Sequence, residues 1–340
     1  MPELNPSHIM QVGMGFFASK TLLSAVELEL FTKLARQPMT GKEVAAALHL
    51  SPRAVPDFPD ALVALKFLER EGDGPGARYS NTSESAFFLD RNSPGYIGGI
   101  LEMANARLYR FWADLTEALK TGKPQNEIKH SGEPMFEKLY ADPARLEQFL
   151  SAMSGISAGN FREFAGKFDF SKFKTLCDVG GATGQLSCLV AAANPHMRCT
   201  NFDLPKVTPI ATRKIQQAGL TDRVTAVSGD FFADPLPKAD VITMGMILHD
   251  WNLERKRVLI RKAYDALPPG GAFVVIEALI DDARRENAFG LMMSLNMLIE
   301  FGDAFDYSGS NFVAWCREVG FRDFKIIPLT GPSSAAVAYK

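Results

Sequence analysis

The stretch TLCDVGGATGQLS, residues 175–187, decides how the second half of this chain folds. A short apolar run ends in Asp178, the turn that follows holds Gly180, Gly181 and Gly184, and an apolar helix-like segment comes next. A strand, a glycine turn and a helix in this order open a Rossmann-like nucleotide-binding unit, in which glycines let the backbone approach a ligand closely. Because many folds also use glycines to pack a helix onto a strand, the meaning of the turn depends on the rest of the chain.

Short strand-like runs alternate with helical stretches from residue 173 onward, as a parallel α/β sheet requires. We expect strands near residues 175–179, 198–202, 224–227, 241–246, 272–277, 324–328 and 335–339. Helices are expected near residues 186–193, 206–218, 253–267 and 312–319. Only a loop separates the last two strands, so one of them is expected to run antiparallel at the sheet edge. The pattern predicts an α/β fold with a seven-stranded sheet.

The first half of the chain indicates helices followed by a hairpin, which is the order of a winged helix. We expect a helix over residues 21–34, a second that a capping box at Thr40 and Glu43 starts, and a third after Ser51 and Pro52. A hairpin tip is expected at residues 72–79, and further helices at 96–121 and 142–168. The expected recognition helix mixes acidic and basic residues, namely Asp57, Asp60, Glu69, Arg53, Lys66 and Arg70. A packing or dimerisation role is therefore favoured over DNA binding.

Composition and charge limit the class of protein further. The 340 residues carry a formal net charge of −2, which gives no electrostatic footprint for nucleic acid or an anionic membrane. The four cysteines show no CxxC spacing, which favours reduced, buried thiols over disulfides or metal ligands. The N-terminus lacks the basic start of a signal peptide, and we expect no apolar segment of the ~18 residues that a membrane span needs. These observations predict a soluble cytoplasmic protein.

Acidic residues follow several of the predicted parallel strands, at the edge where open sheets bind ligands. Asp203 follows the second strand, about 20 residues beyond the glycine turn, where an acid can hold both hydroxyls of a ribose. Asp230 and Phe231 follow the third strand and offer a carboxylate for an adenine amino group and a ring against the base. The fourth strand leads into His249, and the fifth ends in Glu277. This set indicates a nucleotide-type cofactor rather than packing alone.

The glycine turn distinguishes between two such cofactors. Ala182 stands where a dinucleotide-binding GxGxxG motif would have its second glycine. Asp178 precedes the turn, where its carboxylate would repel a pyrophosphate but suits a ligand that carries an ammonium and a sulfonium. The residues therefore favour S-adenosylmethionine over NAD.

Six motifs occur in one order along the chain: CDVGGATG, NFDLP, GDFF, HDW, LPPGG and a GF pair before the last two strands. In this order they resemble the S-adenosylmethionine-dependent O-methyltransferases of the two-domain group that includes the plant caffeic acid and animal acetylserotonin methyltransferases. The resemblance covers nearly the whole chain. It implies a winged-helix dimerisation domain over residues 1–120, a helical connector over 121–170 and a Rossmann-like class I methyltransferase domain over 171–340. It also implies a homodimer that methylates a hydroxyl of a small, aromatic metabolite in secondary metabolism.

By position, the resemblance implies cofactor contacts at the strand ends. The glycine turn would meet the methionine part, Asp203 the ribose, and Asp230 with Phe231 the adenine. Gly245 stands where many plant members have a lysine that contacts the cofactor. The residues expected to bind the cofactor are Asp178, Gly180, Gly181, Gly184, Asp203, Leu204, Gly229, Asp230, Phe231, Gly245, Trp251 and, from the connector, Ser157.

The same resemblance makes His249 the general base and Glu277 the first acid that orients it, with Asp250 beside it in the sequence. The second orienting acid of the family is usually a glutamate in a G-x-E-R-type segment, from which residues 302–307 depart. Asp306 is the best positional match and Asp303 the second. A histidine with a pKa of about 6.5 can take the proton from a phenol with a pKa of about 10 as the new bond forms, and a carboxylate stabilises the imidazolium.

The acceptor pocket and the methylated atom stay open at this point. The expected lining is Phe111, Met153, Met246, Met292 and Asn296, joined by Met14, Phe16 and Phe17 from the N-terminal segment of a partner subunit, and each of these fits a plain core equally well. One alternative is C- or N-methylation, where a metal would need His249 with carboxylates such as Glu277 or Asp306; for the leading interpretation no metal is expected. The others are a winged-helix regulator of DNA and an inactive cofactor-binding scaffold.

Overall fold

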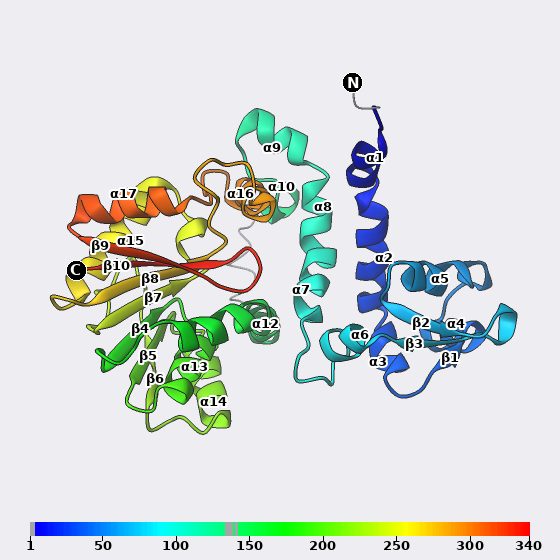
Figure 1. The fold of residues 1–340 in the computed structure, drawn as a ribbon, viewed down its shortest axis with the longest axis horizontal. Coiled ribbons are helices and arrows are strands. Elements are labelled where there is room, and N and C mark those ends of the chain that lie inside the picture. The colour runs from blue at the N-terminus through cyan, green and yellow to red at the C-terminus, as the bar shows by residue number, and fades with distance from the viewer. Residues whose placement is uncertain (1–3, 133–138, 140–141) are drawn as a thin grey trace. The chain divides into compact units, whose positions relative to one another are not determined.

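The computed structural model describes residues 4–132, 139 and 142–340, and the chain divides into two compact units, Met1–Arg110 and Phe111–Lys340 (Figure 1). The first unit is mostly helical and the second is built on a large sheet. Each unit has hydrophobic cores of its own.

The first unit packs helices around a small antiparallel sheet of order β1-β3-β2. Strands β2 and β3 form the expected hairpin, and Thr40 with Glu43 makes the expected capping box. The helical order followed by a hairpin confirms the winged-helix prediction. The elements are α1 (Ser7–Gly13), α2 (Gly15–Glu27), α3 (Leu30–Leu34), β1 (Met39–Thr40), α4 (Gly41–Leu48), α5 (Asp57–Ala64), β2 (Leu68–Glu71), β3 (Arg78–Asn81), α6 (Ser83–Phe88) and α7 (Gly98–Met103).

Two helices expected in this half are interrupted. Glu29 adopts a left-handed backbone with φ 57°, which ends α2 and separates it from α3. The long helix expected over residues 96–121 consists of α7, a π turn at Ala104–Leu108, α8 (Tyr109–Trp112) and α9 (Leu115–Thr121). In the π turn, Asn105 bonds with Lys20 and Glu27 of α2. A π turn changes the helical phase, which a pattern of apolar residues does not reveal.

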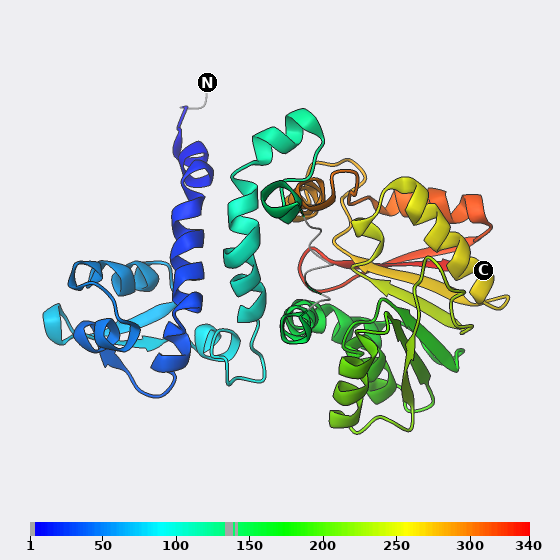
Figure 2. The ribbon, with the colours of Figure 1, turned by 180° about the vertical axis from the view of Figure 1, so that it is seen from behind.

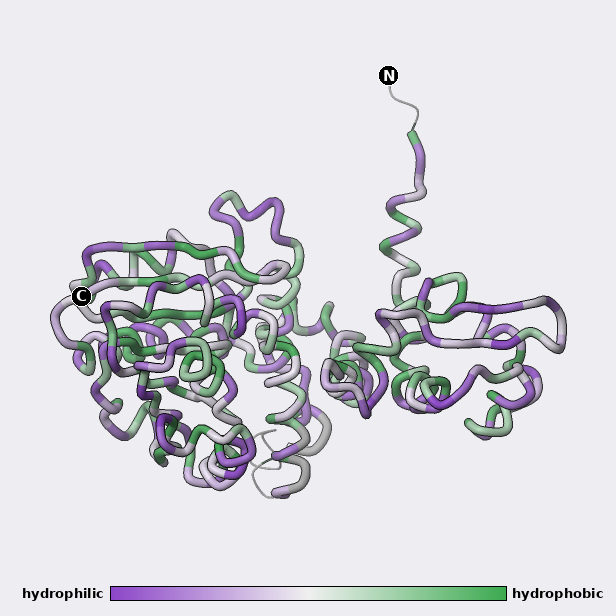
Figure 3. Tube along the Cα trace, turned by 60° about the horizontal axis from the view of Figure 1, so that its bottom comes forward, coloured by the Kyte–Doolittle hydropathy of each residue, from purple (hydrophilic) through white to green (hydrophobic). Residues whose placement is uncertain are grey.

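The stretch from Ser7 to Glu27, which comprises α1 and α2, differs from the sequence expectation. By length and composition alone, these 21 residues are apolar enough to cross a membrane, so the expectation that no segment reaches this length is wrong. Hydrophobic and hydrophilic residues alternate along its start (Figure 3). Its later part packs into the core of the unit through Leu23, Ala25 and Val26. Its exposed apolar side chains are Ile9, Met10, Val12, Met14, Phe16 and Phe17.

The second unit carries a seven-stranded sheet of order β6-β5-β4-β7-β8-β10-β9, with helices on both faces (Figures 1 and 2). Within this sheet, strands β4, β5, β6, β7 and β8 are parallel, and β10 runs antiparallel between β8 and β9. All seven strands match the expected positions within about two residues. One of the last two strands is antiparallel, as expected, but it is β10, one strand in from the edge, and not the edge strand β9. The strands are β4 (Thr175–Val179), β5 (Arg198–Asp203), β6 (Val224–Ser228), β7 (Val241–Gly245), β8 (Ala272–Glu277), β9 (Asp323–Pro328) and β10 (Ser334–Tyr339).

Helices of the second unit agree with the expected ones except for α10 (Glu127–Ser131) and α16 (Ala288–Phe301), which the sequence interpretation did not predict. Apolar residues lie on all sides of α16, so it lacks the polar stripe of an amphipathic helix. The Asn287 side chain accepts a hydrogen bond from the Gly290 amide and caps its start. The other helices are α12 (Pro143–Lys167), α13 (Gln185–Ala193), α14 (Thr208–Gln217), α15 (Leu253–Ala266) and α17 (Gly309–Val319).

Strand β8 lies in the middle of the sheet and is buried along its whole length. Its even-numbered residues join the core under α13, whereas Phe273 and Val275 join the core under α15 and α17. Successive side chains of a strand point to opposite faces, so Glu277 points to the same side as Phe273 and Val275. The fold thereby buries a carboxylate at the carboxyl end of the sheet. The four cysteines are free, and three of them are buried, as expected.

Candidate active site

The glycine turn after β4 has a backbone that only small residues allow. Gly180 and Gly184 have φ values of +68° and +79°, in the left-handed region that favours glycine. A Cβ on Gly181 would lie 1.9 Å from Oδ1 of Asn201, and the Asn201 amide donates to the carbonyl of Ala182. The turn is therefore held tightly against β5, with its backbone available to a ligand.

Asp178 lies beneath this turn rather than in front of it. Its side chain is buried, its Oδ1 accepts a hydrogen bond of 2.8 Å from the Thr243 hydroxyl, and its Oδ2 would be 2.8 Å from a Cβ on Gly181. Burial raises the pKa of Asp178 to about 7. The structure thus places Asp178, which is a residue of strand β4, directly against the glycine turn.

Asp203 ends β5 and is hydrogen-bonded to the glycine turn. Its Oδ2 accepts from the amide of Ala182 at 2.8 Å, and its Oδ1 accepts from the amide of Leu204 at 2.7 Å. Burial raises the pKa of this carboxyl group, and the two backbone amides oppose the shift. A carboxylate fixed in this way has further lone pairs to accept from the hydroxyls of a ligand.

The segment after β6 combines a carboxylate with aromatic rings. The Gly229 amide donates to the Asp203 carbonyl at 2.9 Å, and Asp230 accepts from the Phe232 amide at 2.8 Å through Oδ1. The ring of Phe231 lies edge-on to Trp251, with 6.1 Å between their centres. The structure therefore gathers the residues that were expected around an adenine.

Helix α12 closes the end of β7. A Cβ on Gly245 would lie 2.9 Å from the ring of Phe161, so Phe161 fills the space that a longer side chain at 245 would need. Ser157 is buried one turn before Phe161 on the same helix, and Ser154 bonds to Thr183 of the glycine turn at 2.6 Å. Sequence reasoning missed Phe161, because a phenylalanine in an apolar helix gives no sign of the strand it meets.

His249 lies in a short 3₁₀ turn, Leu248–Asp250, directly after β7, and its side chain is 5% exposed. Its Nδ1 lies 3.3 Å from Oδ1 of Asp306, and its Nε2 lies 3.3 Å from Oδ1 of Asp250. Asp306 is 2% exposed and Asp250 is 25% exposed, so the Nε2 side is the more open one. Both ring nitrogens thus face carboxylates.

Glu277 lies in the same cluster but makes a different contact from the expected one. Its Oε1 accepts from the backbone amide of His249 at 3.2 Å rather than from the imidazole ring. It therefore fixes the turn that carries the histidine. Asp303, the other candidate for the second acid, is exposed and accepts from the Asn252 side chain at 2.7 Å.

Buried charges shift the protonation of this cluster. Burial alone would lower the pKa of His249, but the charges of Asp250, Asp306 and Glu277 outweigh it and raise the pKa to about 10. Burial raises the pKa of Asp250 and of Glu277, and the His249 charge opposes both shifts. A histidine in this setting holds its proton at neutral pH and gives a base only at higher pH.

Lys256 of α15 is a member of this cluster that sequence reasoning missed. It is fully buried, although it stands in the charged run LERKR, which is typical of a solvated helix face. A signal was present in its spacing, since Leu253, Lys256, Ile260 and Ala263 fall on one side of a helix.

The residues expected to line an acceptor pocket have different environments. Asn296 of α16 is buried, and its Oδ1 accepts from the indole N–H of Trp112 at 2.9 Å. Phe111 packs in a core cluster with Ala118 and Ile299, whereas Met292 is 50% exposed. Met246 has a left-handed φ of 55° three residues before His249, and Met153 is partly buried in α12. Within residues 4–132, 139 and 142–340, no group of three or more His, Cys, Asp or Glu side chains has the arrangement of a metal site.

Two family models match the chain. The O-methyltransferase domain matches residues 112–322, and the O-methyltransferase dimerisation domain matches residues 10–91.

Similar proteins cover nearly the whole chain. The tetracenomycin polyketide synthesis 8-O-methyl transferase TcmO of Streptomyces glaucescens is 41% identical over 98% of this chain and 97% of its own length. The N,N-dimethyltransferase OxyT of Streptomyces rimosus is 36% identical over 94% of this chain and 92% of its own. Among solved structures, human N-acetylserotonin methyltransferase in complex with S-adenosylmethionine superposes with a TM-score of 0.91 at 30% identity, over 100% of this chain and 99% of that one.

Proposed function

The chain belongs to the S-adenosylmethionine-dependent O-methyltransferase family, and we propose that it methylates a phenolic hydroxyl of a fused-ring aromatic acceptor with His249 as the general base. The observation that carries this proposal is the position of the His249 ring at the carboxyl end of the sheet, with Nδ1 against the buried Asp306. A base backed by a buried carboxylate is suited to take a proton from an acceptor on its open side.

The residues at the strand ends fit S-adenosylmethionine. Asp203 accepts hydroxyl hydrogen bonds, Phe231 and Trp251 offer rings to a base, and the buried indole N–H of Trp251 has no hydrogen-bond partner within the described residues. The acidic character of the site suits a ligand with an ammonium and a sulfonium. When bound, S-adenosylmethionine supplies an electrophilic methyl group to the acceptor. The chain's own residues hold both reactants and move the proton.

His249 takes the hydroxyl proton on Nε2, because that side of the ring is the more open one. The carboxylate of Asp306 at Nδ1 then stabilises the imidazolium, and Glu277 keeps the ring in place through the backbone amide. A phenol, whose pKa is about 10, is mostly protonated at neutral pH, so removing its proton as the oxygen reacts increases the rate by roughly 10²–10⁴-fold. Positioning both reactants provides a further part of the rate.

The class of acceptor follows from the relatives. TcmO is named for polyketide 8-O-methylation, and it shares 41% of its aligned residues with this chain. Met246, three residues before His249 in the sequence, and Phe305, next to Asp306, add apolar side chains of the kind that suit a flat ring system. An amine acceptor is the second candidate, because OxyT is named as an N,N-dimethyltransferase.

A homodimer follows from the first unit. The exposed apolar residues of α1 and α2 lie in or beside the region that matches the dimerisation domain, and a second copy of the chain would cover them. We propose that residues 1–120 serve this role, that 121–170 connect to the catalytic domain at 171–340, and that the enzyme acts in cytoplasmic secondary metabolism, as the named biosynthesis of its Streptomyces relative suggests.

The test is turnover with methyl-labelled S-adenosylmethionine on a panel of fused-ring phenols, simple phenols and aromatic amines. We expect label on the oxygen of a fused-ring phenol, and a loss of about 10²–10⁴-fold in kcat for His249→Gln with donor affinity retained. Calorimetry with S-adenosylhomocysteine checks that the variant still binds the cofactor. Methylation of a phenol at the wild-type rate by His249→Gln would contradict the mechanism, and label confined to amines would favour the second candidate.

A further inference from the structure

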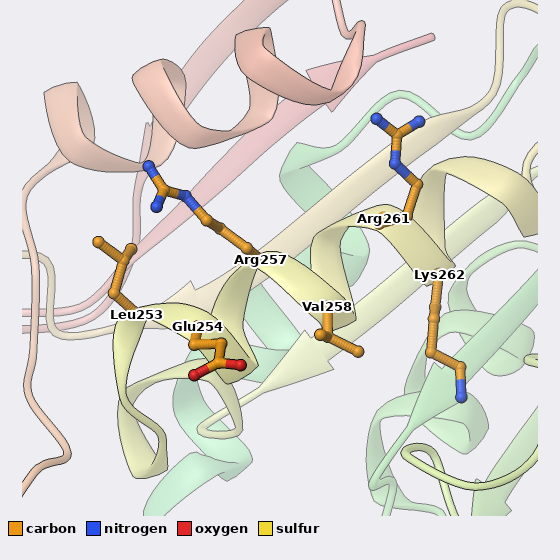
Figure 4. Close-up of a pocket in the computed structure, with 6 residues that line it drawn as sticks. All are labelled: Leu253, Glu254, Arg257, Val258, Arg261 and Lys262. Atoms are coloured by element: carbon orange, nitrogen blue, oxygen red, sulfur yellow. The ribbon is translucent and has the colours of Figure 1, made fainter.

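Lys256 is the one residue of its neighbourhood on α15 whose charge points into the protein. Its side chain is 0% exposed, while Arg257, Arg261 and Lys262 line a surface hollow on the same helix (Figure 4). Arg257 points toward α17, where it pairs with Glu318 at 3.0 Å. Burying an ammonium without partners is strongly unfavourable, so the contacts of Lys256 need an explanation.

Two loops meet at the Lys256 ammonium. It donates hydrogen bonds to the carbonyl of Trp251 and, at 2.8 Å, to the carbonyl of Phe305, and it lies 3.8 Å from the centre of the Phe305 ring. Trp251 directly follows the His249–Asp250 pair, and Phe305 directly precedes Asp306. The ammonium therefore joins the segment that carries the histidine to the segment that carries the carboxylate at its Nδ1.

The charges around Lys256 explain its burial. The pKa of Lys256 is lowered to about 8 by burial, and the neighbouring carboxylates oppose that shift. Three carboxylates, Asp250, Glu277 and Asp306, surround His249, and the Lys256 ammonium offsets part of their negative charge. The titratable groups that face this cluster, from α15, β8, the turn after β7 and the loop before α17, are Lys256, Glu277, His249, Asp250, Asp303, Asp306 and Tyr307.

We propose that Lys256 is a positioning residue for methyl transfer, which holds Asp306 against Nδ1 of His249 by joining the carbonyls of Trp251 and Phe305. This inference rests on the proposed role of His249. Without the ammonium, the Asp306 loop loses a fixed point, and the His249 imidazolium loses part of the support that the Asp306 carboxylate gives it at Nδ1.

The test compares three single variants in the full-length protein. Lys256→Met removes the charge at similar length, Lys256→Arg keeps the charge but changes the fit to the two carbonyls, and Arg257→Met removes a neighbouring exposed cation as the matched control. The measurements are kcat and KM across pH, and NMR titration of the His249 ring, assigned by its loss in His249→Gln. Binding of S-adenosylhomocysteine shows that each variant is folded.

We expect the acidic limb of kcat/KM and the His249 titration to move down in Lys256→Met, the direction expected for Asp306→Asn, because the Asp306 carboxylate is no longer held at Nδ1. In Lys256→Arg, kcat falls about tenfold, because the larger guanidinium displaces the Asp306 loop. Arg257→Met leaves both unchanged. A folded Lys256→Met with an unmoved titration would overturn the proposal, and if that variant does not fold, a Lys256→Arg with wild-type kcat would do so.

The two proposals fail in different ways. If the His249 titration moves in Lys256→Met while turnover is unaffected by His249→Gln, the general-base role is wrong and the control of His249 protonation by Lys256 stands. If turnover depends on His249 but the His249 titration is unchanged in Lys256→Met, only the inference about Lys256 is wrong.

Discussion

The ends of β4 and β5 offer mainly backbone groups to a ligand, whereas the ends of β7 and β8 hold buried charged side chains. The glycine turn and Asp203 are joined by an amide-to-carboxylate hydrogen bond between segments about 20 residues apart. The proton-transfer cluster joins His249, Lys256, Glu277 and Asp306, which come from four segments spread over almost 60 residues. We call the ends of β4 and β5 the first region and the ends of β7 and β8 the second region. Variants that distort the backbone of the first region should weaken donor binding, whereas variants that change the charges of the second region should impair proton transfer.

The largest effect on the first region is expected for Gly181→Ala. Its added Cβ would lie 1.9 Å from Oδ1 of the buried Asn201, so either the turn or Asn201 must move. We expect donor affinity to fall by roughly 10–100-fold, which corresponds to about 1–3 kcal/mol of strain. Calorimetry with S-adenosylhomocysteine measures the loss.

Two comparisons make that result specific. Gly166→Ala adds the same group in α12 at a place where nothing lies within 4 Å, and it should bind the donor normally. The His249 titration should be unchanged in Gly181→Ala. Normal donor binding by Gly181→Ala would mean that the close packing of the turn is not what binds the cofactor.

The sequence revealed the first region well because its signals are local. Alternating apolar runs located the strands, glycines marked the turn, and Asp203 followed at the expected spacing. The winged-helix pattern, the seven-stranded sheet, S-adenosylmethionine and the O-methyltransferase family were all predicted and are confirmed.

The second region was predicted only in part, because its contacts depend on packing. His249 and Asp306 were named and do meet, but nothing in the sequence shows that Glu277 contacts the backbone of His249 instead of its ring. Lys256 resembled an exposed charge because its neighbours are exposed charges. Helix α16 was missed, since it is apolar on every side and so has no amphipathic period.

The pH dependence of activity tests the second region. The three carboxylates, against the effect of burial, raise the pKa of His249 to about 10, so the fraction of neutral base at pH 7 is small and rises with pH. We therefore expect kcat/KM to increase between pH 7 and about pH 10. Asp306→Asn removes a negative charge at Nδ1, which lowers the pKa of His249 and moves this limb down by about one pH unit. Maximal kcat should also fall about tenfold, because the imidazolium loses its support.

Asp303→Asn is the matched control for this prediction. Asp303 lies three residues away, is exposed, and contacts Asn252 rather than the histidine. Its pH profile should stay within about 0.3 pH units of the wild type, since exposed charges are well screened. An equal shift in both variants would mean that the pKa of His249 depends on the total negative charge of the loop and not on the contact of Asp306 at Nδ1.

The smallest effect is expected at the acceptor side of the second region, where Asn296 accepts from the indole of Trp112. Asn296→Leu leaves a buried N–H without its acceptor, while Trp112→Phe removes the donor and leaves the amide. Each should raise the acceptor KM by about two- to fivefold with donor affinity unchanged. In the double variant neither partner is left unpaired, so its effect should be smaller than the product of the two single effects. If the two single effects on KM multiply in the double variant, the two side chains contact the acceptor separately. If KM is unchanged, the pair belongs to the core. This double-mutant cycle therefore decides whether the acceptor region extends from His249 onto α16.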